Sequence, residues 1–263
     1  MTDRTLHSSS RDLAEQAGAV LLELRARLQA ERVGPREMKR AGDRAAQESI
    51  ADGLARLHPG DAVLSEEAPD DLRRLSCDRV WIVDPLDGTR EFGEPPRDDC
   101  AVHVAVWERG ELVAGTVALP ARGVVRSTGP FATGRPPTRR PGPLRLAVSR
   151  SRPTALVVDL ADQLQAELVP MGSAGVKAMA VVDGTVDAYV HAGGQFEWDS
   201  AAPVAVARAH GLHTSRVDGS ALRYNAPDPW LPDLVVCRPE VADLLLTTIA
   251  AMPDVTGTAT GRA

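Results

Sequence analysis

Two carboxylates and a hydroxyl fall close together in the segment Asp84-Pro85-Leu86-Asp87-Gly88-Thr89. The four apolar residues before it predict a strand, and because Pro85 cannot donate to a neighbouring strand, we expect that strand to end at Asp84. Gly88 lets the backbone approach a ligand closely or adopt a positive φ. Ligands of α/β proteins usually bind at strand ends. The segment therefore predicts a site that presents two acids and the Thr89 hydroxyl from one tight turn.

A second pair of acids, Glu66-Glu67, follows the apolar run Ala62-Val63-Leu64 and its neighbour Ser65. This run also predicts a strand, so its end could face the same cleft as Asp84 and Asp87. Four carboxylates that converge there repel one another unless cations lie between them. Hard oxygen donors of this kind are typical of a magnesium site.

A third acidic motif contains Asp199, which stands just before a predicted helix whose first turn tolerates Pro203. Taken alone, Asp199 has the position of an ordinary helix N-cap, for which aspartate is among the preferred residues. The two other acidic clusters make a role as a metal ligand the better explanation.

Two other metal or phosphate motifs are compatible with parts of the central segment. A calcium-binding EF-hand loop requires an oxygen ligand at its third position and a glutamate at its twelfth, where this chain has Leu86 and Pro95, so that reading fails. Phosphatases with an aspartyl nucleophile carry Asp-x-Asp-x-Thr, whereas two residues separate Asp84 from Asp87 here. Water, and not a carboxylate, is then the expected nucleophile.

The elements that must position these acids are short and alternate in type. Apolar residues at helical spacing predict helices over residues 11–30 and from Asp43 to about residue 57. Runs rich in β-branched residues predict strands at 62–64, 80–83, 101–107 and 112–119, the last two forming a hairpin across Glu108-Arg109-Gly110. In the C-terminal half, strands are expected at 144–149, 168–170, 186–190 and 234–236, and helices at 156–165, 175–182, from about 199 to 211, and 240–251.

Proline and glycine dominate between Ser127 and Pro143, and apolar periodicity is lost there. We expect a loop or lobe boundary in this stretch. It separates an N-terminal α+β lobe, residues 1–143, with the Glu66 and Asp84–Thr89 motifs, from a C-terminal α/β lobe, residues 144–263, with Asp199. The order of elements predicts a layered α/β (α+β) fold.

Composition excludes several classes of protein. Of 263 residues, 43% are hydrophobic and 25% charged, as in ordinary soluble proteins, and the absence of a run of about 18 apolar residues argues against a membrane partner. The polar first residues lack the apolar stretch of a secretory signal, which predicts a cytoplasmic location. A net charge of −6 argues against a nucleic-acid polymer as partner but suits a small anion held through metal ions.

Three segments resemble, in this order, the signature of the inositol monophosphatase superfamily: Leu64-Ser65-Glu66-Glu67, Trp81 to Thr89, and Trp198-Asp199-Ser200-Ala201-Ala202-Pro203. The extension Arg90-Glu91-Phe92 and the segment Gly172 to Lys177 look most like its CysQ-type 3′(2′),5′-bisphosphate nucleotidases. The resemblance covers residues 12–251. It implies a layered α-β-α-β-α sandwich, a requirement for two or three Mg²⁺ ions per site, and sensitivity to lithium.

The resemblance also implies roles for single residues. Glu66, Asp84 and the carbonyl of Leu86 would hold one ion, and Asp84, Asp87 and Asp199 the second. The implied catalytic residues are Asp84, Thr89 and Asp43, and the implied substrate-binding residues are Glu66, Leu86, Asp87, Gly88, Thr89, Ser173, Lys177 and Asp199.

Two of these residues, Asp43 and Lys177, have alternatives. Asp43 is the end of Arg40-Ala41-Gly42-Asp43, where the family often has Thr-x-x-Asp, so it could support the attacking water through Thr89 or simply cap a helix. Lys177 could lie near a second phosphate, with Ser173 near a ribose, or be a solvated helix lysine. Asp187, Tyr189 and His191 share one face of a predicted strand and could reach the cleft.

The function implied is Mg²⁺-dependent removal of the 3′-phosphate from adenosine 3′,5′-bisphosphate, with its sulfated form as a further substrate, in sulfur metabolism. Hydrolysis of inositol 1-phosphate or fructose 1,6-bisphosphate by the same metal core is the alternative, and a catalytically silent sensor of nucleotide or magnesium is a third. A small phosphorylated molecule is the expected partner in each case. A monomer and a homodimer are equally compatible with the sequence.

Overall fold

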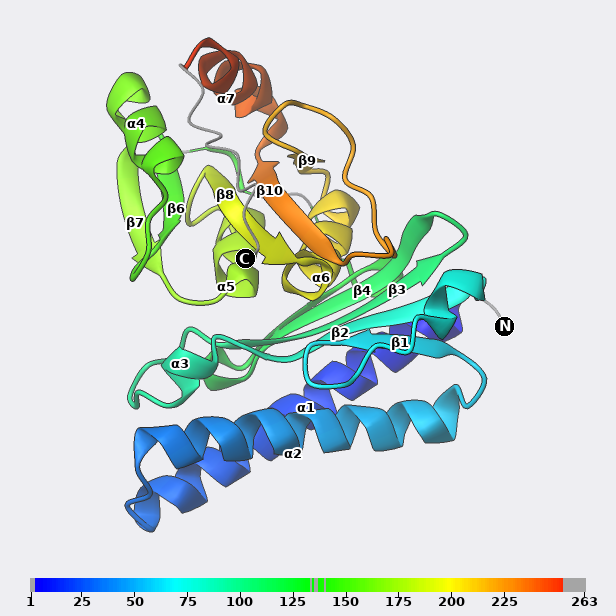
Figure 1. Ribbon diagram of the computed structural model, residues 1–263. Coiled ribbons are helices and arrows are strands. Elements are labelled where there is room, and N and C mark those ends of the chain that lie inside the picture. Colours follow the sequence, from blue (N-terminus) through cyan, green and yellow to red (C-terminus); the bar gives the residue numbers. More distant parts are fainter. Residues whose placement is uncertain (1–2, 133, 135–136, 140, 253–263) are drawn as a thin grey trace, which may run out of the picture.

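The computed structural model describes residues 3–132, 134, 137–139 and 141–252. Over these residues the chain forms five layers, in the order helix, sheet, helix, sheet, helix (Figure 1). The expected α-β-α-β-α sandwich is therefore confirmed.

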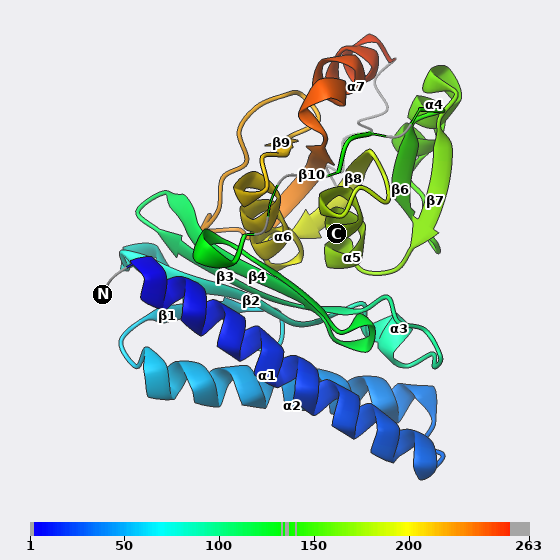
Figure 2. The same ribbon diagram turned by 180° about the vertical axis from the view of Figure 1, so that it is seen from behind.

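The first layer consists of α1 (Asp3–Ala30) and α2 (Pro35–Leu57), which lie along one face of the first sheet (Figures 1 and 2). Leu13, Ala17 and Leu21 recur at helical spacing on α1 and are buried against that sheet. Helix α1 begins before the predicted residue 11 because Leu6 continues the same buried face.

Helix α2 begins at Pro35, so the predicted start at Asp43 is wrong. Proline fits the first position of a helix because the missing N–H has no partner there, and Met38 and Ala41 extend the buried face in this direction. Asp43 therefore lies inside the helix and is not an N-cap.

The first sheet has the order β1-β2-β3-β4-β5, in which β1 and β2 are parallel and the other pairs antiparallel. Its strands are β1 (Ala62–Ser65), β2 (Arg79–Asp87), β3 (Ala101–Glu108), β4 (Glu111–Leu119) and β5 (Val124–Ser127). The hairpin of β3 and β4 is confirmed, whereas β5, which is only four residues long, was not predicted.

The prediction that the strand ends at Asp84 is wrong, because β2 continues through Pro85 to Asp87. Asp84 lies opposite His103 and Asp87 opposite Ala101, so β2 carries one extra residue between the two pairs. An irregularity of this kind places a proline without breaking the rest of the ladder. It also brings both carboxylates to one place.

The central and outer layers come from the second half of the chain. Between the sheets lie α5 (Ala174–Val182) and α6 (Glu197–Ala209), and α4 (Ala155–Leu164) and α7 (Pro239–Ala251) cover the far side of the second sheet. This sheet has the order β7-β6-β8-β10-β9, with strands β6 (Arg145–Ser149), β7 (Glu167–Met171), β8 (Ala188–Phe196), β9 (His213–Ser215) and β10 (Trp230–Cys237).

Two predicted boundaries in this half are wrong. Strand β8 begins after Asp187 and runs on to Phe196, because the glycines at 193 and 194 do not end it. Helix α6 begins at Glu197, so Pro203 lies in its interior and not in its first turn. The short helix α3 (Thr89–Phe92) and strand β9 were not predicted.

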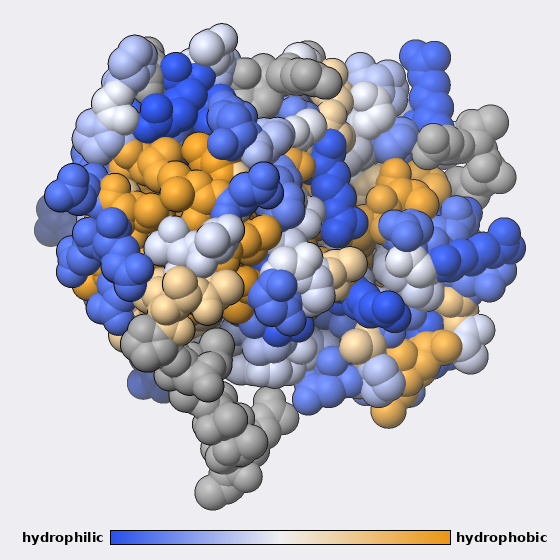
Figure 3. Space-filling model, turned by 90° about the horizontal axis from the view of Figure 1, so that it is seen from above, coloured by the Kyte–Doolittle hydropathy of each residue, from blue (hydrophilic) through white to orange (hydrophobic). Residues whose placement is uncertain are grey.

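Seen from above, the outer face with α4 and α7 shows a hydrophobic area bordered by hydrophilic residues (Figure 3). Leu244 on α7 contributes to the exposed apolar surface of the molecule. None of the helices in the described part of the chain combines the length and the apolar character needed to cross a membrane. The predicted loop over residues 127–143 lies partly outside the described residues.

Candidate active site

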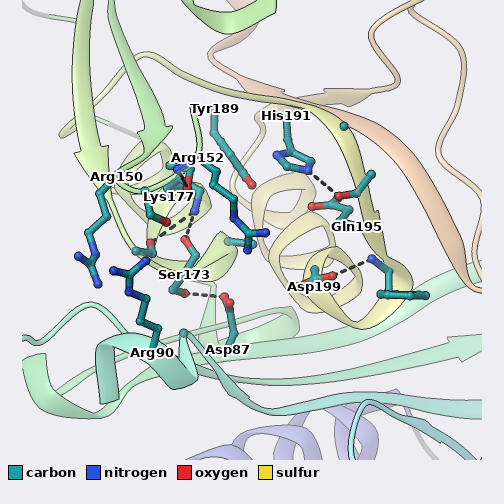
Figure 4. A pocket seen from close by; sticks show the side chains of 18 of the residues that line it. Asp87, Arg90, Arg150, Arg152, Ser173, Lys177, Tyr189, His191, Gln195 and Asp199 are labelled. Carbon is teal, nitrogen blue, oxygen red and sulfur yellow. Dashed lines mark hydrogen bonds between the residues drawn. The ribbon is translucent and has the colours of Figure 1, made fainter. Parts of the chain in front are cut away.

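A cavity of about 510 Å³ lies between the end of β2, helix α3 and strands β6, β8 and β10 of the second sheet (Figure 4). Its lining has acidic, basic and aromatic parts. The acidic residues are Glu66, Asp87, Glu91 and Asp199; the basic ones are Arg90, Arg150, Arg152 and Lys177; the aromatic ones are Tyr189, His191, Phe196, Trp198 and Trp230.

Four carboxylates from three distant segments converge at the acidic end. Asp84 and Asp87 come from β2, Glu66 follows β1, and Asp199 is the third residue of α6. The Glu66 and Asp84 carboxyl groups are hydrogen-bond neighbours, and both feel the charges of Asp87 and Asp199. The structure thus brings together the acids that the sequence singled out.

These acids are poorly compensated by protein cations. Burial, followed by the charges of Asp87 and Glu66, raises the pKa of Asp84 well above its ordinary value. Burial of the carboxyl group raises the pKa of Glu66 to about 7, although much of the rest of this residue is exposed. Burial also raises the pKa of Asp199 to about 6. Among the described residues, no ion pair joins these three acids to a lysine or arginine. Such a set of oxygen donors fits divalent cations.

Asp87 differs from the other acids because it is anchored to helix α5. Its carboxylate accepts hydrogen bonds from the Ser173 hydroxyl and, at 2.7 Å, from the backbone N–H of Gly175. Burial alone would raise the pKa of Asp87, but contacts with His103 and Lys177 hold it below its usual range. Ser173 lines the cavity, so its position near a ribose stays a prediction, and its hydroxyl also fixes a predicted metal ligand.

His103 was not identified from the sequence. It is fully buried on β3, its Nδ1 lies 3.1 Å from the carbonyl oxygen of Trp198, and its Nε2 lies 3.3 Å from Asp87. A Cβ at Gly175 would come within 2.1 Å of this ring, so only glycine fits at that position. Asp84, Asp87 and His103 offer ligand atoms that all lie within 4.8 Å of one another.

Gly88 and Thr89 complete the turn after β2. Gly88 has φ of +86°, in the left-handed region that favours glycine, and a Cβ there would lie 3.3 Å from Ser173. The Thr89 hydroxyl is 3.1 Å from both Asp43 Oδ1 and the carbonyl oxygen of Leu86. The predicted link between Asp43 and Thr89 is therefore present, and burial raises the pKa of Asp43 to about 6.

Lys177 is buried, so the alternative of a solvated helix lysine is wrong. Its Nζ donates to the carbonyl oxygen of Ser173 at 2.6 Å and lies 5.2 Å from the centre of the Tyr189 ring. Burial lowers the pKa of Lys177, and Asp87 opposes this. Lys177 and Tyr189 both line the cavity.

Two arginines of the loop after β6 were also missed. Arg150 donates to Glu91 and Glu94, both at 2.6 Å, and is held in that network. Among the described residues, no carboxylate pairs with Arg152, whose exposed side chain extends into the cavity (Figure 4). A free guanidinium in this place is a candidate anion ligand.

The remaining predicted residues divide between the cavity and its surroundings. His191 lines the cavity, whereas Asp187 accepts from the backbone N–H of Arg145 and lies at a different pocket. Asp199 is not an N-cap, because Phe196 has that position and donates its N–H to the Asp199 carboxylate at 2.7 Å.

The raised pKa values predict how pH affects the protein without metal. A carboxyl group whose pKa is raised by folding binds its proton more tightly in the folded state. The folded state therefore loses stability as pH rises from about 4, the ordinary pKa, to about 7, the pKa of Glu66 in the folded protein. Divalent ions bind only the ionised groups. The rise in thermal midpoint caused by Mg²⁺, relative to EDTA, should therefore be larger at about pH 8 than at about pH 5. A larger rise at the lower pH would contradict this.

Comparisons with known proteins agree with the fold and show the family of the chain. A protein of Mycobacterium tuberculosis named 3′-phosphoadenosine 5′-phosphate phosphatase is 55% identical over 240 residues, which cover 89% of each chain. The 3′(2′),5′-bisphosphate nucleotidase CysQ of Escherichia coli is 32% identical over 73% of this chain and 81% of its own. The crystal structure of CysQ from Bacteroides thetaiotaomicron, a member of the inositol monophosphatase family, has a TM-score of 0.75 at 26% identity and covers 89% of this chain and 97% of its own. The family model for inositol monophosphatases matches residues 3–251, and the chain therefore belongs to the inositol monophosphatase family.

Proposed function

We propose that the protein is a Mg²⁺-dependent phosphatase that removes the 3′-phosphate from adenosine 3′,5′-bisphosphate. Relatives that are 50–55% identical carry the name of this activity. The observation that carries the proposal is the charge distribution of the cavity, with carboxylates at one end and cationic side chains elsewhere on its wall. A substrate with two separated phosphates suits that distribution, because one can bind at the metal site and the other at the cations.

The acidic end supports a site for at least two magnesium ions. Glu66, Asp84 and the carbonyl of Leu86 would hold one ion, and Asp84, Asp87 and Asp199 the other. Asp84 would be a ligand of both ions, because its carboxylate is buried beside three other acids and has no lysine or arginine partner among the described residues. Bound Mg²⁺ supplies charge neutralisation for the phosphoryl group and lowers the pKa of water.

The protein's own groups position the reactants. The ionised Asp43 carboxylate accepts a hydrogen bond from the Thr89 hydroxyl, so Thr89 can take a proton from the attacking water while its own proton passes to Asp43. Because a hydroxyl has one proton, Thr89 donates to Asp43 or to Leu86 but not to both at once. The backbone at Gly88 and Thr89 faces the phosphate, and Asp87 is held in place by α5.

Inositol 1-phosphate and fructose 1,6-bisphosphate remain the alternative substrates, and a silent sensor is the alternative to an enzyme. We would compare kcat/KM with Mg²⁺ for adenosine 3′,5′-bisphosphate, its sulfated form and the two sugar phosphates. The nucleotide should be preferred by about tenfold or more, because inositol 1-phosphate lacks the second charged group that the cationic residues would bind, and fructose 1,6-bisphosphate has that group but lacks the base. Preference for a sugar phosphate would overturn the assignment, and no release from any of the four would favour the sensor.

Arg152 is proposed to bind the phosphate that is not cleaved. Arg152→Met keeps much of the apolar stem but removes the charge, so KM for adenosine 3′,5′-bisphosphate should rise by roughly 10-fold. Hydrolysis of adenosine 3′-monophosphate, which lacks the second phosphate, should change much less. Arg56→Met is a matched control, because Arg56 is exposed in the last turn of α2 and outside the cavity. Equal effects on the two substrates would refute this role.

We also propose that residues 1–143 and 144–263 are two lobes. The strands of the first sheet lie within 62–127 and those of the second within 145–237, which supports the division. The cytoplasm remains the expected compartment, and a monomer or homodimer the expected assembly.

A further inference from the structure

We infer that the neutral end of the cavity is a purine-base site, in which the Trp230 indole stacks on the base and Gln195 reads its edge. This inference rests on the proposed function and deepens it, because it assigns the part of the substrate that neither phosphate occupies. Both residues line the cavity that contains the acidic cluster, and they lie in neighbouring strands β10 and β8.

The stacking surface is part of a cluster of three aromatic rings. Phe196 stacks on Trp198 with ring centroids 4.6 Å apart and 12° between the planes. Trp230 contacts Phe196 edge-on, with 5.4 Å between the ring centroids, and the two residues are paired across β8 and β10. Trp230 nevertheless remains 39% exposed, so part of its indole stays available to a ligand. Every nucleobase has a π-face that can stack on such a ring.

The local backbone is shaped to hold the indole in this position. A Cβ at Gly194 would come within 1.7 Å of Trp230 Cζ2, and Gly194 has φ of +87°. Only glycine meets both conditions, so the ring lies directly against the strand. An aromatic ring fixed before binding loses little conformational entropy when a ligand stacks on it.

Gln195 supplies the polar contact at this end. It is 7% exposed, lines the cavity, and its buried Nε2 has no hydrogen-bond partner among the described residues. A buried amide without a partner is costly, so a ligand acceptor here would satisfy it. A carboxamide can donate to N7 and accept from the 6-amino group of adenine, whereas a 6-oxo purine presents an acceptor in place of that donor.

Charge separates this end from the rest of the cavity. Gln195, Phe196 and Trp230 are uncharged, and the Nε2 of His191 is 2.9 Å from the carbonyl oxygen of Gly194. Burial lowers the pKa of His191, which keeps the imidazole neutral near pH 7. An uncharged aromatic surface suits a base and gives no advantage to a second phosphate or to a polyhydroxylated ring.

The test compares two compounds that share a ribose 5-phosphate group, of which only one carries a base. Adenosine 5′-monophosphate and ribose 5-phosphate would be titrated calorimetrically, with Mg²⁺, into the wild type and into Trp230→Ala, Trp230→Phe and Leu57→Ala. The wild type should prefer the nucleotide by about 5-fold or more, the range that base stacking gives. Trp230→Ala should lose most of this ratio and Trp230→Phe should keep most of it. Leu57, exposed at the end of α2, is the control and its variant should keep the wild-type ratio.

A wild-type protein that binds the nucleotide no better than ribose 5-phosphate, or a Trp230→Ala protein with an unchanged ratio, would overturn the inference. For Gln195, the wild type should prefer adenosine 5′-monophosphate to inosine 5′-monophosphate, and Gln195→Leu should reduce that preference. Equal wild-type affinity for these two would refute its role. Failure to hydrolyse the bisphosphate despite a clear base preference would instead count against the proposed function alone.

Discussion

Replacing Asp84 with asparagine is expected to lower kcat by roughly 10³-fold or more while the protein remains folded. The side chain is 1% exposed and adjoins three other acids, so an amide would remove the charge shared between the proposed ions with little change in shape. Steady-state kinetics with saturating Mg²⁺ measures the effect.

The same substitution has a second expected result. In EDTA, the thermal midpoint of Asp84→Asn should be no lower than that of the wild type, because the change removes a buried charge without a lysine or arginine partner among the described residues. Asp78→Asn is a control, since Asp78 is exposed and pairs with Arg109 outside the cavity. A folded Asp84→Asn enzyme with near-normal turnover would contradict the assignment of the metal site.

Thr89→Val is expected to reduce kcat by about 10²-fold, within the range for removal of a group that assists proton transfer. Valine keeps the branched shape but loses the hydroxyl that contacts Asp43 and the Leu86 carbonyl. Thr89→Ser should retain most activity. Thr248→Val removes a hydroxyl on α7 that donates to the carbonyl oxygen of Leu244 outside the cavity, and should have no effect.

A double-mutant cycle with Asp43→Asn tests whether Asp43 acts through Thr89. If the two form one unit, the double variant should be about as slow as Thr89→Val alone, since residues in one network are not additive. Independent, multiplying effects would argue that Asp43 has only a structural role. The cycle is useful because Asp43 lies inside α2, where a capping role is excluded.

The metal cluster was predictable from sequence because most of its geometry is local. Asp84, Asp87 and Thr89 lie within six consecutive residues, and Glu66 follows another strand of the same sheet. Asp199 was singled out only in combination with the other acidic motifs and through the resemblance to a known family, since an acid near a helix start is common in any protein. The layered fold followed from the alternation of strands and helices.

The residues that were missed depend on contacts distant in sequence. His103 faces Asp84 because of the register between β2 and β3, which stays regular as far as this pair and shifts only beyond it. Arg152 has no local pattern that marks it as a ligand, and its position in the cavity follows from how the second sheet lies over the first. Trp230 meets Phe196 through the pairing of β8 and β10. Register and sheet packing were not encoded in the spacing of motifs.

The most direct test of the central proposal is to identify the products formed from adenosine 3′,5′-bisphosphate by ³¹P NMR, with Mg²⁺ and with excess EDTA. We predict inorganic phosphate and adenosine 5′-monophosphate in the presence of Mg²⁺, and no reaction when EDTA removes it. Formation of adenosine 3′-monophosphate, unchanged hydrolysis in EDTA, or no hydrolysis with Mg²⁺ would contradict the proposal.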